Sequence, residues 1–81
     1  LRQDSKFLNI FIDKSGLIFL NKQKISLDNI RDIISNLINE SKNLVVLHAD
    51  KNVSHGIVIK VLDSLRSIEG LKIAISTKSI E

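Results

Sequence analysis

The sequence predicts an α+β domain in which two helices pack on one face of a mixed β-sheet, in the order β-β-(β)-α-β-α-β. The prediction depends first on residues 44–76, where an apolar run (44–47), a helical pattern and a second apolar run (73–75) follow one another. Two short apolar runs joined by a helix are typical of a βαβ unit, whose strands lie parallel and whose crossover is right-handed. The residues before position 44 must complete the same sheet.

Two further strands are predicted near the N-terminus. Residues 7–12 are almost all apolar and rich in strand-forming residues, and residues 17–20 repeat that signal. Between them, residues 13–16 have a turn composition in which Gly16 can adopt positive φ. The two runs therefore predict a hairpin, and residues 24–25 are long enough only for a very short third strand.

Two amphipathic helices are predicted, with Ser26 and Ser54 as N-caps and Gly70 as the left-handed residue that closes the second helix. In each helix the apolar side chains form one stripe about 140° wide, as expected for a helix that lies on a sheet. The stripes consist of Leu27, Ile30, Ile33, Ile34, Leu37 and Ile38 in the first helix, and of Ile57, Val58, Val61, Leu62, Leu65 and Ile68 in the second.

The last strand indicates that both helices lie on the same face. Lys72 and Ala74 alternate with Ile73 and Ile75, so the opposite face of the sheet is expected to be partly wet. Ile59 falls outside the stripe of the second helix. It is either an ordinary exposed isoleucine or an apolar contact for a partner.

Length and composition predict one domain at residues 7–81, preceded by a polar lead-in or linker at residues 1–6. The chain has no cysteine, which excludes disulfides and thiolate chemistry. Twelve basic and nine acidic residues give a net charge of +3, but the basic residues alternate with acidic ones, as on a solvated surface. No apolar run reaches the ~20 residues of a membrane span, and no segment resembles a signal peptide.

A set of residues around the second helix forms a family pattern: Ala49, Asp50, Val53, Gly56, Val58, Val61, Asp63, Leu65, Arg66 and Gly70. This pattern resembles that of the periplasmic domain of the ExbD/TolR family, and the likeness extends over residues 7–77. The chain departs from the family at His55, where an aromatic residue is common, at Leu62, where methionine is frequent, and at residues 68–69.

The resemblance implies a parent protein held in the bacterial inner membrane by an N-terminal transmembrane helix that is absent here, with this domain in the periplasm. It implies a stator-like subunit that couples the proton motive force to outer-membrane transport or envelope integrity, with no enzymatic activity and no cofactor or metal. The implied partners are a second copy of the chain, a multi-span ExbB/TolQ-like channel protein, a TonB/TolA-like protein and peptidoglycan.

Within this hypothesis, three groups of residues are candidates for partner binding. The junction after the strand at 44–47 offers Asp50, Asn52 and His55, because ligands of such sheets bind at the carboxyl ends of parallel strands. The second helix offers Ile59, Asp63 and Arg66. The last strand and the residues after it offer Thr77 and Ile80, which could pair across a two-fold axis.

Two hypotheses from other classes stay open at this point. His48, Asp50 and His55 could hold a zinc ion in a small hydrolase, although Asp50 could equally cap the backbone of the following turn. A basic nucleic-acid-binding βαβ domain is the other alternative. Base stacking would favour aromatic residues on central strands, and residues 44–47 and 72–76 contain none.

Overall fold

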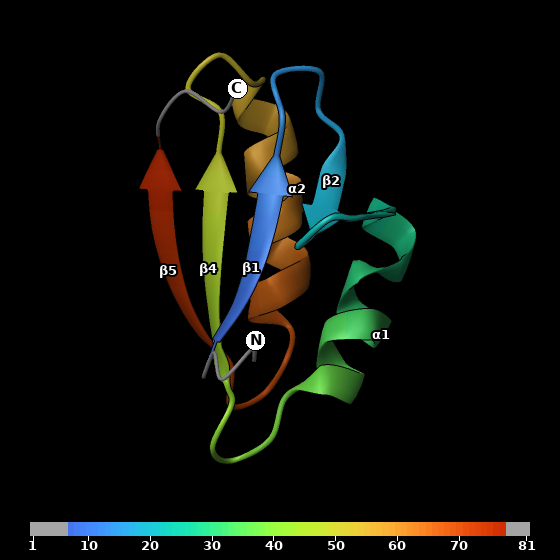
Figure 1. Ribbon diagram of the computed structural model, residues 1–81, viewed down its shortest axis with the longest axis vertical. Coiled ribbons are helices and arrows are strands. Elements are labelled where there is room, and N and C mark those ends of the chain that lie inside the picture. The colour runs from blue at the N-terminus through green and yellow to red at the C-terminus, as the bar shows by residue number, and fades with distance from the viewer. Residues whose placement is uncertain (1–6, 78–81) are drawn as a thin grey trace.

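The computed structural model describes residues 7–77, which form a five-stranded sheet and two helices (Figure 1). The elements are β1 (Phe7–Ile12), β2 (Ile18–Leu20), β3 (Gln23–Ile25), α1 (Leu27–Leu37), β4 (Leu44–Ala49), α2 (His55–Arg66) and β5 (Lys72–Thr77). The predicted α+β class and element order are confirmed. The predicted lead-in at residues 1–6 lies outside the described residues.

The strands lie in the order β3-β2-β1-β4-β5, so the N-terminal strand β1 is in the middle of the sheet. β1 pairs antiparallel with β2 and parallel with β4, and β4 pairs parallel with β5. These pairings confirm the predicted hairpin and the parallel βαβ strands. In the hairpin turn the Asp13 carboxylate accepts hydrogen bonds from the backbone N–H groups of Ser15 and Leu17, both at 2.9 Å, and Gly16 adopts a φ of 89°.

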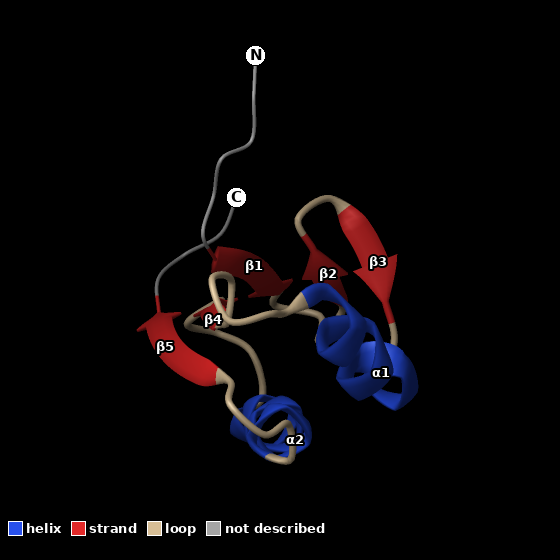
Figure 2. Ribbon diagram, turned by 90° about the horizontal axis from the view of Figure 1, so that it is seen from below, coloured by secondary structure: helices blue, strands red, loops and turns tan. Residues whose placement is uncertain are grey.

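Both helices pack on the same face of the sheet, as predicted (Figure 2). The core between them is wholly aliphatic and holds alternate residues of the strands together with the inner sides of the helices. Its buried members are Leu8, Ile10, Ile12, Ile18, Leu20, Ile25, Ile30, Ile34, Val45, Leu47, Val61, Leu62, Leu65 and Ile68. Burial of these side chains is the main source of stability in a domain that has no disulfide.

Three local expectations differ from the structure. Leu37 is 43% exposed, because it is the last residue of α1 and no further helical turn continues the stripe beyond it. Ser26 and Ser54 occupy the N-cap positions, but neither side chain makes a capping hydrogen bond. Gly70 has the expected positive φ of 84°, yet α2 ends at Arg66 and Gly70 belongs to the turn that leads into β5.

Candidate partner-binding surfaces

The junction after β4 is organised by Asp50, whose side chain is buried. One carboxylate oxygen accepts a hydrogen bond from the backbone N–H of Asn52 at 2.8 Å, and the Asp50 carbonyl accepts one from the N–H of Val53 at 3.0 Å. Asp50 is therefore part of the turn itself, which is the capping role considered from the sequence. Asn52 and His55 are exposed and are the residues of this junction that a partner would meet.

Four of the candidate residues lie along one side of α2. His55, Ile59, Asp63 and Arg66 are separated by four, four and three residues, a spacing that places them on a single face of a helix. All four are exposed, and the side chains of Asp63 and Arg66 form a surface ion pair at 4.0 Å. We call these four residues the α2 stripe.

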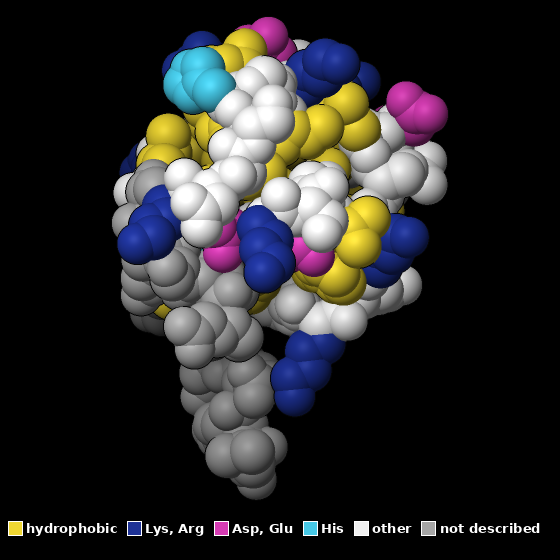
Figure 3. Space-filling model, turned by 90° about the horizontal axis from the view of Figure 1, so that it is seen from above, with side chains coloured by type: hydrophobic (Ala, Val, Ile, Leu, Met, Phe, Trp, Pro, Cys, Tyr) yellow, Lys and Arg dark blue, Asp and Glu magenta, His cyan; other side chains and the backbone are white. Residues whose placement is uncertain are grey.

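A hollow of ≈ 310 Å³ lies beside the N-terminus of α2, where the β1–β2 turn approaches the helix. A Cβ placed on Gly16 would lie 4.0 Å from Cγ1 of Ile57, which shows how near the two segments are. The hollow is lined by Lys14, Ser15, Gly16, Val53, Ser54, Gly56, Ile57 and Lys60. In Figure 3, which looks onto this end of the molecule, hydrophobic side chains are visible between basic ones.

The hollow could not be predicted from the sequence. Lys14 and Lys60 are far apart in the chain, and their proximity depends on how the hairpin turn lies against α2. No spacing or motif in the sequence predicts the contact between the hairpin turn and α2.

The β5 strand is one edge of the sheet. Ile75 is 54% exposed there, so a large aliphatic side chain lies at the surface of the edge strand. Thr77 is the last residue of β5, and Ile80 lies outside the described residues. The edge leaves one side of the β5 backbone available for pairing with another strand.

The zinc hypothesis is wrong for these residues. The Nε2 atom of His48 lies 2.9 Å from Oδ1 of Asn9, and the imidazole ring stacks on Phe11 with centroids 4.6 Å apart. The Asp50 carboxylate instead accepts a hydrogen bond within the following turn, and His55 is the first residue of α2. Within residues 7–77, no group of three or more His, Cys, Asp or Glu residues is arranged to hold a metal ion.

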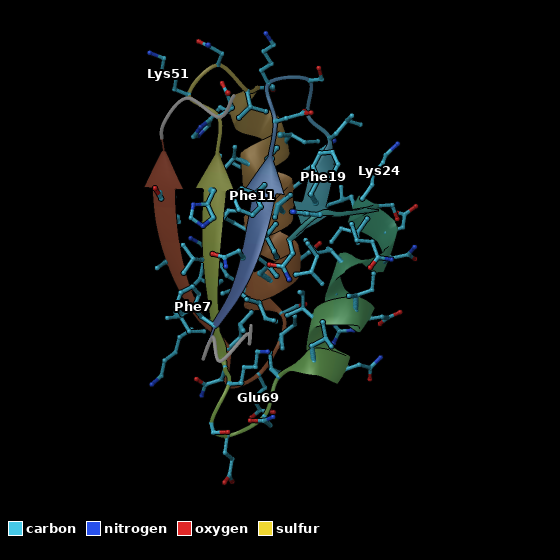
Figure 4. The ribbon with its side chains drawn as sticks, viewed as in Figure 1. Phe7, Phe11, Phe19, Lys24, Lys51 and Glu69 are labelled. Atoms are coloured by element: carbon cyan, nitrogen blue, oxygen red, sulfur yellow. The ribbon has the colours of Figure 1, made fainter. Side chains whose placement is uncertain are left out.

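The face of the sheet that the helices leave uncovered carries all three phenylalanines of the chain. Phe7 and Phe11 lie on the middle strand β1, and Phe19 is the direct neighbour of Phe11 on β2 (Figure 4). The strands at 44–47 and 72–76 lack aromatic residues, but β1 and β2 supply them on this face. In the sequence, Phe7, Asn9 and Phe11 alternate with aliphatic residues, and this period of two could have placed the two phenylalanines of β1 on one face.

Comparison with known proteins shows which family the chain belongs to. Within residues 7–77, neither helix is long and apolar enough to cross a membrane. A relative from Synechocystis sp., named as an ExbD biopolymer transport protein, is 30% identical over 69 residues, which cover 84% of this chain and 26% of the relative. The chain thus spans about a quarter of that relative's length. The family described as biopolymer transport protein ExbD/TolR matches residues 2–79, and the chain belongs to this family.

Proposed function

We propose that this chain is the periplasmic domain of a stator-like subunit anchored in the bacterial inner membrane, which couples the proton motive force to outer-membrane transport or to envelope integrity. The observation that supports this proposal is the ExbD/TolR family match over residues 2–79. The domain contributes binding surfaces and a rigid sheet, and it carries no chemistry of its own.

The proposal assigns a different task to each candidate surface. The α2 stripe contacts a moving TonB/TolA-like protein or the ExbB/TolQ-like channel, because its isoleucine and its ion pair are exposed on one helical face. The junction residues Asn52 and His55 extend that surface toward peptidoglycan. The β5 edge pairs with a second copy of the chain, since its backbone and Ile75 are accessible.

A genetic experiment tests the function in the source organism. Deletion of the parent gene is expected to abolish growth on a ferric siderophore as the only iron source, or to cause sensitivity to detergents. The first phenotype identifies an ExbD-like role and the second a TolR-like role. A deletion strain with neither phenotype would contradict the proposal.

The same strain tests the α2 stripe. Complementation with Ile59→Asp in the full-length protein is expected to fail, because a carboxylate replaces the apolar centre of the stripe. Leu37→Asp is the matched control, since Leu37 is exposed to a similar extent on α1. Equal activity of the two variants, at equal protein levels, would remove the α2 stripe from the proposed interface.

Self-association tests the β5 edge. Ile75→Lys is expected to weaken dimerisation in sedimentation experiments, because a lysine on an edge strand disfavours pairing with another strand. Ile59→Lys, an equivalent change on α2, should leave association unaltered. A dimer that resists Ile75→Lys would exclude this edge as the contact.

The alternative function is binding of nucleic acid by a small basic βαβ domain, and the aromatic residues on β1 and β2 are the observation in its favour. Binding of single-stranded DNA or RNA that weakens with salt, with a log–log slope of several units, would support it. The ExbD/TolR proposal predicts no such binding.

A further inference from the structure

The uncovered face of the sheet has an ordered distribution of side chains. Residues paired across neighbouring strands point to the same side, so the strand register assigns this face. Its large apolar members are Phe7 and Phe11 on β1, Phe19 on β2, and Leu44 and Val46 on β4. These three strands are the inner strands of the sheet. The apolar residues therefore form a central band.

Lysines border this band on both sides. Lys24 lies on the edge strand β3 as the neighbour of Phe19, and Lys72 lies on the edge strand β5 as the neighbour of Leu44. Both lysines are exposed, and no strand residue on this face within residues 7–77 is acidic. The face is thus an apolar band with positive charge at each edge.

The polar residues inside the band are already paired with each other. Asn9 and His48 make the 2.9 Å side-chain contact described above, and the imidazole stacks on Phe11. Covering polar groups is costly mainly when they lose hydrogen bonds to water without replacement. An internal pair reduces that cost, so a partner can cover this band without supplying a donor or acceptor to every polar group.

We propose that the uncovered face binds an amphipathic helix of another protein, with an apolar stripe flanked by aspartate and glutamate residues. The apolar band is three strands wide, roughly 10 Å at the usual strand spacing, which matches the ~10–12 Å diameter of a helix with its side chains. Acidic residues on both sides of the stripe would lie near Lys24 and Lys72 (Figure 4, where Lys24 is labelled). The chain's own helices cover the other face in the same manner.

Charge complementarity favours this occupant over a second copy of the same face. Two copies would place basic faces against each other, and like charges across an interface oppose association. The face lies on the opposite side of the sheet from the α2 stripe, and of its residues named above only Lys72 belongs to the β5 edge. The proposed function rests on the family match and not on this face, so failure of the proposal would leave that function intact.

Two synthetic peptides test the proposal. Both are helices of about 14 residues, roughly 20 Å long and so as long as a six-residue strand. They share one leucine stripe, which is flanked by glutamates in the first peptide and by lysines in the second. Each is titrated into the isotope-labelled 81-residue chain and followed by NMR. We expect saturable shifts at amides of β1, β2 and β4, and about tenfold tighter binding of the acidic peptide.

Charge reversal provides the matched variants. Lys24→Glu with Lys72→Glu is expected to remove the preference for the acidic peptide. Lys14→Glu with Lys60→Glu changes the net charge equally at the end of the molecule near α2, and it should leave the preference in place. NMR spectra of each variant establish that it is folded before titration.

Several outcomes would overturn the proposal. These are equal affinity for the two peptides, shifts confined to α1 and α2, or the absence of saturable binding. Tighter binding of single-stranded DNA or of phosphatidylglycerol vesicles to the same amides would assign the face to a different class of partner. Concentration-dependent shifts of these amides without peptide would assign it to a second copy of the chain.

Discussion

The two faces of the sheet differ in composition as well as in exposure. The face under the helices is aliphatic, and its buried core side chains are 0–8% exposed, with Ile75 on the edge strand as an exception at 54%. The uncovered face holds the three phenylalanines together with leucine, valine, asparagine, histidine and lysine. Aromatic residues usually dominate the energetics of both cores and interfaces. Here they are absent from the core, so the aromatic surface of the domain lies on the face that the helices leave uncovered.

Removal of a large side chain from the covered face should have the largest effect on stability. Ile10 is fully buried at the centre of β1, so Ile10→Ala should lower the free energy of unfolding by about 2–5 kcal/mol, measured by urea denaturation. The exposed Ile59 provides the control, for which Ile59→Ala should change the value by less than about 0.5 kcal/mol. Similar losses of unfolding free energy in the two variants would contradict the assignment of stability to the covered face.

The adjacent residue tests the uncovered face. Phe11 is half-buried and stacks on His48, so Phe11→Ala should cost roughly 1–2 kcal/mol in the same assay, from lost apolar burial and the lost ring contact. The expected loss is smaller than that of Ile10→Ala although the side chain is larger. A greater loss would mean that the uncovered face contributes to the core.

The smallest effect is expected at the surface of α2. Asp63 and Arg66 are about two-thirds exposed and 4.0 Å apart, so Asp63→Ala should change the free energy of unfolding by less than about 0.5 kcal/mol. The measurement is repeated at low and high salt. A large, salt-sensitive loss would show that this ion pair is structural, and a small one leaves it available for binding.

Most of the fold could be predicted from the sequence because its signals are local. The apolar run at residues 7–12, the turn at 13–16 and the two apolar stripes each depend on neighbouring positions, and each corresponds to an element of the structure. The stripe prediction was wrong at Leu37, where the end of the helix and not periodicity decides exposure. The α2 stripe could also be predicted from local signals, since helical spacing alone places Ile59, Asp63 and Arg66 on one side of the helix.

The features that could not be predicted depend on which strands become neighbours in the sheet. The position of β1 in the middle of the sheet is decided by its pairing with β4, more than thirty residues later. That pairing places Phe11 beside His48 and removes His48 from any shared site with His55. The hollow between Lys14 and Lys60 and the lysines at the two sheet edges likewise require the complete topology.

The central place of β1 has a mechanical consequence. Tension applied to the chain just before Phe7 would act along a strand that pairs parallel with β4 over Phe7–Ile12 and antiparallel with β2 over residues 10–12. Extraction of that strand requires many hydrogen bonds to shear together, whereas an outer strand can be peeled away one bond at a time. A pull at this end would thus load β4 along the full parallel ladder, and β2 through the last three residues of β1.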